Sequence, residues 1–315
     1  MEHIVFLDRS TIRAQFRAPA FPHTWRDYDA TTASEVVARL AEATMAITNK
    51  VQFTRDILSR LPNLKLIAVT ATGYNNVDIK ACRERGVAVA NVRGYALHSV
   101  PEHVFAMVFA LRRNLMAYRE DILQGRWQQE SKFCFFDYPL LDLHGSTLGI
   151  IGAGTLGRET ARIGEALGMR VLYAQSLHGD EVADDRVPLD QLLAESDVIS
   201  LHCPLTERTR GLIGERELRS MKPGALLINT ARGGIVDEAA LAQALQQGWI
   251  AGAGVDVLTE EPPRHGNPLL EIVTPNLIIT PHVAWASEQA MQGLADQVVA
   301  NLDAFVAGRP QNLVT

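Results

Sequence analysis

The stretch LGIIGAGTLGRETARIGEALGMRVLYAQS, residues 148–176, decides the fold. Its first apolar run predicts a buried strand, and the residues after it, Gly152, Ala153, Gly154, Thr155, Leu156 and Gly157, have the spacing G-x-G-x-x-G. A helical pattern and a second apolar run complete a strand–helix–strand unit of about thirty residues. Glycines at these positions permit a tight turn, close approach of the backbone to a pyrophosphate and close helix–strand packing. The stretch therefore predicts a loop that binds a dinucleotide.

The end of the second strand departs from the pattern usual for such a loop. About twenty residues beyond the loop, an acidic residue is expected to bind the ribose hydroxyls of NAD and to repel a 2′-phosphate. This chain has Gln175 there, and Ser176, Leu177 and His178 follow it without an arginine that would bind the phosphate of NADP. An unperturbed histidine is mostly neutral at pH 7. We expect a permissive pocket that favours NAD and tolerates NADP.

Short apolar runs alternate with helical patterns along the whole chain, which is typical of parallel α/β sheets covered on both faces. The long helical pattern at 98–125 separates two such series and is a candidate bridge between domains. The final helix, about 287–307, is expected to return to the first series. The fold class is therefore α/β, with two doubly wound parallel-sheet domains, one Rossmann-like and one flavodoxin-like. Strands are expected at Ile4–Leu7, Met45–Ile47, Leu66–Val69, Val87–Ala90, Leu148–Ile151, Val171–Ala174, Val198–Leu201, Leu226–Asn229, Gly252–Val255 and Leu277–Thr280. Further helices are expected at Ser34–Ala43, Arg55–Arg60 and Val77–Arg85, and starting near Thr155, Leu189, Asp237 and Pro268.

The composition excludes several classes of partner. The 315 residues carry a net charge of −6 and no run of Lys and Arg, which argues against a nucleic-acid partner. No apolar run reaches the ~18 residues that span a bilayer, so no membrane partner is expected. Cys82, Cys134 and Cys203 lie far apart, without the spacing of a metal site. We expect reduced thiols, a cytoplasmic location and no metal.

Three chemically capable side chains, Arg232, Glu261 and His282, each follow one of the last three expected strands. The carboxyl ends of parallel strands meet at one edge of a sheet, where ligands bind. An arginine can bind the carboxylate or carbonyl oxygen of a 2-keto acid, and a histidine can protonate that oxygen as a hydride arrives. A glutamate beside the histidine would favour its charged form. Taken singly, each of the three is as readily a surface charge or a packed ring.

Several longer motifs occur with the glycine loop in a fixed order and cover nearly the whole chain. Together they resemble the D-isomer-specific 2-hydroxyacid dehydrogenases, and three stretches resemble most the glycerate dehydrogenase/hydroxypyruvate reductase branch. The motifs of the family are HCPLTERTRGLI (202–213), MKPGALLINTARGGIVDEAAL (221–241), GAGVDVLTEEP (252–262) and PHVAWAS (281–287). Those of the branch are ATGYNNVDI (71–79), NVRGYALHSVPEHVFA (91–106) and HVAWAS (282–287).

The resemblance implies a reversible, NAD(P)-dependent reduction of hydroxypyruvate or glyoxylate to D-glycerate or glycolate, with Arg232, Glu261 and His282 as the catalytic residues. It implies that backbone amides at Thr72 and Gly73, together with Arg232, hold the substrate carboxylate. Residues 1–98 and 289–315 would form the substrate-binding domain, which closes over a dinucleotide-binding domain at 99–288. The implied cofactor contacts, beyond the glycines of the loop and Gln175, are Thr155, Leu156, Cys203, Pro204, Thr209, Thr230, Ala231 and Asp256.

The motifs leave two other functions open. A D-2-hydroxyacid dehydrogenase for bulkier 2-keto acids and a nucleotide-sensing, corepressor-like interaction protein share these motifs, whereas formate dehydrogenases typically carry Gln where Glu261 stands. Arg93 and Trp285 are candidates for selecting substrate size.

The segment 125–145 carries five aromatic residues outside any regular pattern, so it packs either on its own helix or on a second subunit. Because members of the family generally dimerise through this region, we expect a homodimer.

Overall fold

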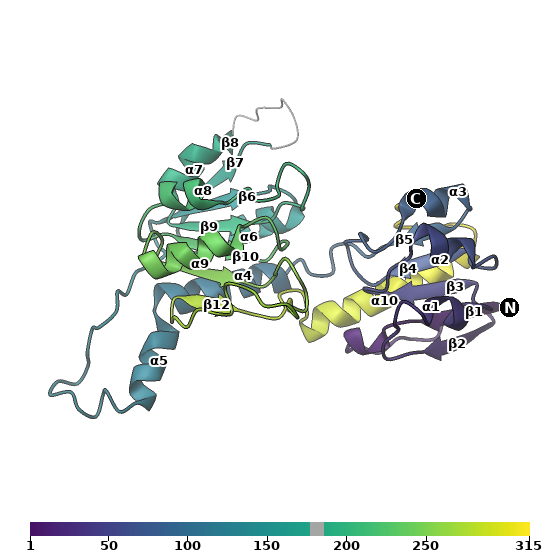
Figure 1. Ribbon diagram of the computed structural model, residues 1–315, viewed down its shortest axis with the longest axis horizontal. Helices are drawn as coiled ribbons and strands as arrows, with labels where there is room; N and C mark the ends of the chain where they lie inside the picture. The colour runs from purple at the N-terminus through teal and green to yellow at the C-terminus, as the bar shows by residue number, and fades with distance from the viewer. Residues whose placement is uncertain (177–185) are drawn as a thin grey trace. The chain divides into compact units, whose positions relative to one another are not determined.

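The computed structural model describes residues 1–176 and 186–315, so Leu177 and His178 lie outside the described residues. The chain divides into two compact units, Met1–Ala96 with Ala286–Thr315 (unit 1) and Leu97–Trp285 (unit 2). Each unit is built around its own parallel β-sheet with helices on its faces (Figure 1). The predicted fold class, two parallel-sheet α/β domains, is confirmed.

The sheet of unit 1 has five parallel strands in the order β2-β1-β3-β4-β5, which is the flavodoxin-like order. β3 and β4 are buried along their whole length, because helices cover both faces of a parallel sheet. β2 was not expected, since its sequence HTWRD is polar and lies at a half-exposed edge. The strands are β1 (Glu2–Phe6), β2 (His23–Asp27), β3 (Met45–Thr48), β4 (Leu66–Val69) and β5 (Ala88–Ala90).

The helices of unit 1 are short, with one exception. The helix expected at Ser34–Ala43 is reduced to a single turn. The C-terminal helix returns to unit 1 as expected: the Asn301 side-chain amide donates to the Asn91 carbonyl at 2.9 Å, and Gln292 bonds both backbone groups of Gln15. No helix in the described part of the chain has the length and apolarity needed to cross a bilayer. The helices are η1 (Arg9–Thr11), α1 (Val36–Arg39), α2 (Arg55–Ser59), α3 (Ile79–Glu84) and α10 (Glu288–Val306).

The sheet of unit 2 has seven parallel strands in the order β12-β11-β10-β9-β6-β7-β8. β6 lies between β9 and β7, so the direction of strand succession reverses at β6 and creates the crevice where doubly wound sheets bind ligands. The two-residue β8 was not expected. The strands are β6 (Thr147–Ile151), β7 (Arg170–Ala174), β8 (Arg186–Val187), β9 (Val198–Leu201), β10 (Leu226–Asn229), β11 (Gly252–Val255) and β12 (Leu277–Ile279).

Two helix predictions in unit 2 are wrong. The single helix expected over 98–125 is two helices, because Asn114 between them adopts a left-handed conformation with φ 48°. The first of them, α4, packs on the sheet of its own unit through Val104 and Met107. Residues 268–270 form a turn instead of a helix, since the Asn267 side chain accepts from the Leu269 N–H. The helices are α4 (Ser99–Arg112), α5 (Leu115–Leu123), α6 (Thr155–Ala166), α7 (Leu189–Glu195), α8 (Glu215–Ser220) and α9 (Glu238–Gln247).

Candidate active site

A histidine–glutamate pair lies beyond the carboxyl ends of β11 and β12. His282 Nδ1 and Glu261 Oε2 are 2.6 Å apart, and the other carboxylate oxygen accepts from the Leu258 N–H at 2.9 Å. The two side chains are 25% and 33% exposed, so the pair is reachable from solvent. With Nδ1 engaged by the carboxylate, the imidazole presents Nε2 to a ligand. The sequence-predicted Glu261 and His282 are therefore brought together, in an arrangement suited to general acid–base chemistry.

The turn that carries His282 is held by a buried carboxylate. Asp256, at the end of β11, is 2% exposed and accepts from the Val283 and Ala284 N–H groups at 2.8 and 2.9 Å and from the Thr280 hydroxyl. His282 itself has φ 55°, a left-handed conformation that is uncommon for residues other than glycine. The hydrogen bonds of Asp256 thus fix the backbone on which the imidazole stands.

Two further side chains support this turn. The indole N–H of Trp285 donates to the His282 carbonyl at 2.9 Å. His103 Nε2, from α4, lies 3.0 Å from the hydroxyl of Thr280, which in turn bonds Asp256. Sequence reasoning missed His103, because its partner is 177 residues away and no motif links them. Trp285, expected to select substrate size, is placed where it orients the backbone of His282.

Arg232 lies at the end of β10, on a loop that packs against the segment leading to Glu261. The Asn229 side chain organises this loop, since it donates to the Arg232 carbonyl at 3.0 Å and accepts from the Ala231 N–H at 3.1 Å. Gly233 approaches the Leu258 backbone so closely that a Cβ there would fall 1.9 Å from the Leu258 oxygen. The Arg232 side chain is exposed, and its guanidinium donates to the Ala231 carbonyl at 2.7 Å.

The predicted carboxylate-binding residues Thr72 and Gly73 follow β4 in unit 1. The Thr72 hydroxyl donates to the Val92 carbonyl at 2.9 Å, and the Thr72 carbonyl accepts from the Asn91 side chain at 2.7 Å. Among residues 1–176 and 186–315, no acceptor takes the backbone N–H of Thr72 or of Gly73. These contacts hold the loop without using its two amides. Arg93, also in unit 1, donates to the Leu313 carbonyl and the Asn91 side chain.

The glycine loop joins β6 to α6 with the geometry expected of a phosphate-binding turn. Gly152 has φ 107°, and a Cβ there would fall 2.6 Å from the Cys203 backbone nitrogen. A Cβ on Gly157 would fall 2.1 Å from the Gly152 oxygen, so neither position accepts a side chain without movement of the backbone. Gly154 caps α6 without a side-chain hydrogen bond, which leaves the first amides of the helix for an anion.

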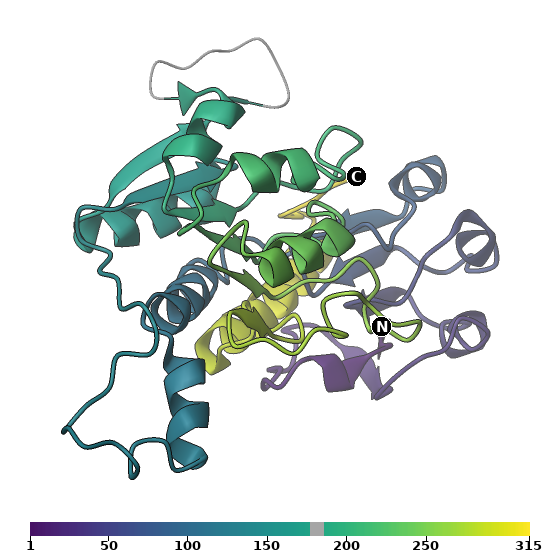
Figure 2. The ribbon, with the colours of Figure 1, turned by 60° about the vertical axis from the view of Figure 1, so that its left-hand side comes forward.

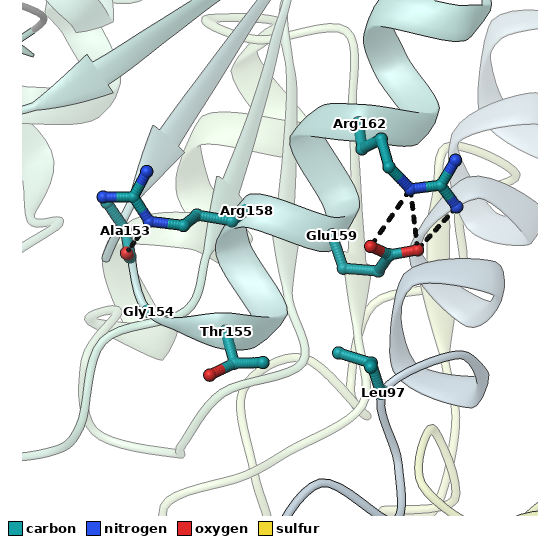
Figure 3. Close-up of a pocket in the computed structure, with 7 residues that line it drawn as sticks. All are labelled: Leu97, Ala153, Gly154, Thr155, Arg158, Glu159 and Arg162. Atoms are coloured by element: carbon teal, nitrogen blue, oxygen red, sulfur yellow. Dashed lines mark hydrogen bonds and ion pairs between the residues drawn. The ribbon is translucent and has the colours of Figure 1, made fainter.

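Two hollows flank this loop, one of them at the start of α6. Figure 3 shows Thr155, Arg158, Glu159 and Arg162 on α6, with Leu97 near Thr155. Arg158 donates from Nε to the Ala153 carbonyl at 3.0 Å. Arg162 is paired with Glu159 at 2.6 Å, which leaves Arg158 as the cation nearest the loop in this view. Sequence reasoning missed Arg158, although it stands directly after the third glycine.

The other hollow is a cavity of about 320 Å³ along the end of β7, a volume in the range of ligand sites. It is lined by five of the predicted cofactor residues, Gly152, Gly154, Gln175, Cys203 and Pro204, and by residues not predicted, among them Arg186 and His202. Burial raises the pKa of the Cys203 thiol to about 11, so this cysteine is a neutral part of the wall rather than a nucleophile.

The remaining predicted cofactor residues differ in what their side chains contact. The Thr209 hydroxyl is fully buried, donates to the Pro204 carbonyl at 2.7 Å and accepts from the Thr206 N–H at 2.7 Å. It therefore shapes the Cys203–Pro204 turn from inside. The Thr230 hydroxyl, at the end of β10, is buried and has no hydrogen-bond partner among the described residues. A buried polar atom without a partner is costly unless a ligand supplies one.

Comparison with known proteins decides the family. Residues 105–284 match the model of the D-isomer specific 2-hydroxyacid dehydrogenase, NAD binding domain. The chain belongs to the D-isomer-specific 2-hydroxyacid dehydrogenases. It is 52% identical over 312 residues to the glycerate dehydrogenase of Methylorubrum extorquens, covering 99% of this chain and 98% of that one. It is 38% identical to the hydroxypyruvate reductase of Blautia hydrogenotrophica, covering 91% and 90%.

A solved structure extends the comparison. The D-lactate dehydrogenase of Aquifex aeolicus, complexed with NAD and lactic acid, matches with a TM-score of 0.80 at 29% identity, covering 99% of this chain and 98% of that one. The predictions of an oxidoreductase, of its family and of NAD as cofactor are thereby confirmed.

The residues of this dehydrogenase fit a bound dinucleotide. The free amides at the start of α6 suit a pyrophosphate, and the glycine loop leaves room for close approach of its backbone. The Gln175 side chain lines the cavity where the adenosine ribose lies in this kind of domain. The Thr230 hydroxyl, which finds no partner among the described residues, supplies a buried polar group directly after β10.

His202 of the dehydrogenase should stay neutral at pH values well below 6.5, where an ordinary histidine is already protonated. Burial lowers its pKa from 6.5 to about 4, and its Nε2 lies 2.9 Å from the Ser200 hydroxyl. The unfolded chain takes up this proton near pH 6.5, so the free energy of unfolding is expected to fall as the pH drops from 6.5 toward 4. In an NMR titration, the imidazole signal that disappears in His202→Asn should move only below about pH 5. A midpoint near 6.5 would contradict this assignment.

Proposed function

We propose that this dehydrogenase reduces hydroxypyruvate and glyoxylate to D-glycerate and glycolate, reversibly and with NADH as the preferred reductant. The observation that carries the chemistry is the 2.6 Å contact between His282 and Glu261 at the sheet edge that also holds Arg232. The choice of substrate is supported by 52% identity to a glycerate dehydrogenase over almost the full chain.

The chain's own residues account for binding and proton transfer. The cofactor, when bound, would supply the hydride to C2 of the substrate as NADH, or accept it from C2 as NAD⁺ in the reverse direction. His282 donates the Nε2 proton to the carbonyl oxygen as the hydride adds to the carbonyl carbon, and the product is the alcohol. Glu261 accepts the hydrogen bond from Nδ1–H and so holds the imidazole with Nε2 toward the substrate. The imidazole then recovers its proton from solvent, and in the reverse direction it accepts the hydroxyl proton.

The substrate carboxylate has two proposed partners. The planar guanidinium of Arg232 offers two parallel N–H donors to a carboxylate. The amides of Thr72 and Gly73 are the second, supported by their lack of acceptors in the described parts of the chain. We accordingly assign substrate binding to residues 1–98 and 289–315 and dinucleotide binding to 99–288. The proposed cofactor contacts include Thr155, Leu156 and Ala231 beside the residues already described.

A steady-state panel tests the substrate. We expect kcat/KM with NADH to be highest for hydroxypyruvate, followed by glyoxylate, and at least about tenfold lower for pyruvate and phenylpyruvate. A higher kcat/KM for phenylpyruvate would replace the proposal with a dehydrogenase for bulkier 2-keto acids. NADH binding without turnover of any 2-keto acid would favour a nucleotide-sensing protein instead.

Replacing Gln175 by Asp should change cofactor preference selectively. A carboxylate at the end of β7 repels a 2′-phosphate but accepts hydrogen bonds from ribose hydroxyls. We expect kcat/KM with NADPH to fall about tenfold or more, while the value with NADH stays within about twofold. Gln175→Asn is the control, because asparagine has the same length as aspartate but carries no charge. An unchanged NADPH/NADH ratio in Gln175→Asp would refute this view of the pocket.

We also propose that the protein is a homodimer formed through α5 and the segment after it, which project from the body of unit 2 (Figures 1 and 2). Part of the segment packs on its own helix, since the Phe135 and Tyr138 rings lie 5.4 and 5.2 Å from the Tyr118 ring. Phe133 and Phe136 remain 88% and 77% exposed, which is unusual for large apolar side chains.

Sedimentation equilibrium tests the dimer. The expected mass is twice the 34.6 kDa of the chain, and Phe133→Asp with Phe136→Asp should give the monomer. A monomeric unaltered protein would contradict the proposal. Phe109→Asp, at a 43% exposed position on α4, controls for the loss of an exposed aromatic residue elsewhere.

A cytoplasmic location is proposed on the state of the cysteines. Cys82, Cys134 and Cys203 are all free thiols, and Cys82 and Cys203 are buried. Free thiols persist in reducing compartments. Fractionation of cells with an antibody to the protein would test this location, and recovery outside the cytoplasm would refute it.

A further inference from the structure

Arg186 is a cation in the wall of the nucleotide cavity to which the proposed reaction assigns no role. It is half-buried and lines the cavity together with Gln175 and Ser176. It lies on β8, where it is the direct neighbour of Tyr173 in the parallel ladder. The Gln175 N–H donates to the Val187 carbonyl at 2.9 Å, so the short strand is hydrogen-bonded to the residue directly after β7. The backbone thus fixes Arg186 beside Gln175.

The strand register also determines the face on which these side chains lie. Side chains alternate along a strand, so Tyr173 and Gln175 lie on one face of the sheet, and Arg186, the ladder neighbour of Tyr173, shares it. Arg158 approaches the same face from α6, with its Cζ 6.0 Å from the centroid of the Tyr173 ring. Two guanidinium groups therefore flank the end of β7 where it meets the glycine loop.

This is the place where the adenosine ribose lies in a doubly wound dinucleotide-binding domain. A carboxylate there would exclude a 2′-phosphate, but Gln175 is uncharged. A guanidinium forms strong, paired hydrogen bonds with phosphate oxygens. We propose that Arg186 binds the 2′-phosphate of NADP(H) and thereby widens the cofactor range of the enzyme beyond NAD(H). The inference deepens the cofactor part of the proposed function and rests on it.

This assignment changes the expectation drawn from the sequence. The residues directly after Gln175 contain no arginine, which favoured a pocket that merely tolerates the phosphate. The structure supplies the arginine from the neighbouring strand, eleven positions further along the chain, counted from 175 to 186. On this proposal the pocket does not merely tolerate the 2′-phosphate of NADP, because Arg186 binds it.

Isothermal titration of the full chain with NADP⁺ and with NAD⁺ tests the proposal without requiring turnover. Arg186→Gln should weaken NADP⁺ binding about tenfold or more, because a hydrogen-bonded charge pair is lost, and should leave NAD⁺ binding within about twofold. Arg186→Lys, which keeps the charge but loses the fork, should lie between the two. The matched control is Arg216→Gln on α8, which removes the same charge from a 74% exposed side chain that lines neither hollow.

The outcomes separate this inference from the proposed function. An unchanged ratio of NADP⁺ to NAD⁺ affinity in Arg186→Gln would overturn the role of Arg186, even if hydroxypyruvate proves to be the substrate. An equal loss for both nucleotides would also overturn it, because the residue would then act on the shared part of the cofactor. A selective loss supports it even if another 2-keto acid is the substrate. Adenosine 2′,5′-bisphosphate should compete with NADP⁺ for the unaltered protein and bind Arg186→Gln more weakly.

Discussion

Replacing His282 by Ala is expected to lower kcat/KM for hydroxypyruvate by about 10²–10⁴-fold while NADH binding persists. The loss is expected because the substitution removes the group that we propose protonates the carbonyl oxygen, and the Glu261 side chain, 2.6 Å from Nδ1 in the unaltered protein, does not replace it. Steady-state kinetics measure the loss, and quenching of NADH fluorescence measures binding. Near-normal turnover would remove His282 from the mechanism.

The chain offers a matched control for this substitution. His265 is also paired with a glutamate, Glu260, at 2.8 Å, but its side chain is 85% exposed. His265→Ala therefore removes the same chemical pair from a neighbouring loop. We expect kcat/KM to stay within about twofold of the unaltered value, since exposed ion pairs contribute little. A comparable loss in both variants would point to a general effect on this region rather than to proton transfer.

The second large effect is expected at Gly233, a residue with no side chain to take part in chemistry. A Cβ there would fall 1.9 Å from the Leu258 oxygen and 2.1 Å from its carbonyl carbon, so Gly233→Ala must separate two backbone segments. One segment carries Arg232 and the other leads to Glu261. Displacement by about 1 Å can cost about 100-fold in rate, and we expect at least that loss in kcat/KM for hydroxypyruvate.

Gly224→Ala is the control for this prediction. Gly224 precedes β10, as Gly233 follows it, but a Cβ at Gly224 meets nothing within 4 Å. Its kcat/KM and its melting temperature should stay near those of the unaltered protein. If Gly233→Ala retains full activity, the close approach of the two loops does not set the catalytic geometry. If both variants lose activity equally, the effect lies in the strand and not in the contact.

The elements of the fold that can be predicted are those whose pattern lies within a short stretch of the sequence. Gly152, Gly154 and Gly157 stand at fixed spacing between two apolar runs, and that spacing is required by the backbone itself. Buried parallel strands such as Val198–Leu201 are recognisable because both of their faces need apolar residues. β2 and β8 were missed since an exposed edge strand needs no such pattern, and the turn at 268–270 depends on one Asn267 side chain.

The residues of the candidate site also divide into those that local sequence predicts and those that contacts between distant segments place. Arg232, Glu261 and His282 could be grouped because parallel strands deliver their carboxyl ends to one edge. Arg186 could not be found, because its position beside Gln175 depends on the register between β7 and β8. The support that Asp256, His103 and Trp285 give to the histidine turn could not be foreseen either, since hydrogen bonds between distant segments leave no periodic trace in the sequence.

The left-handed backbone of His282 sets stability and catalysis against each other at one position. A residue with a Cβ is disfavoured by about 1–2 kcal/mol in this conformation, whereas glycine adopts it freely. Glycine at position 282 would therefore relieve the backbone, but it would also remove the imidazole that we propose as the proton donor. Consensus or computational stabilisation of this enzyme would need to exempt that residue, because the substitution that relaxes the backbone also removes the acid.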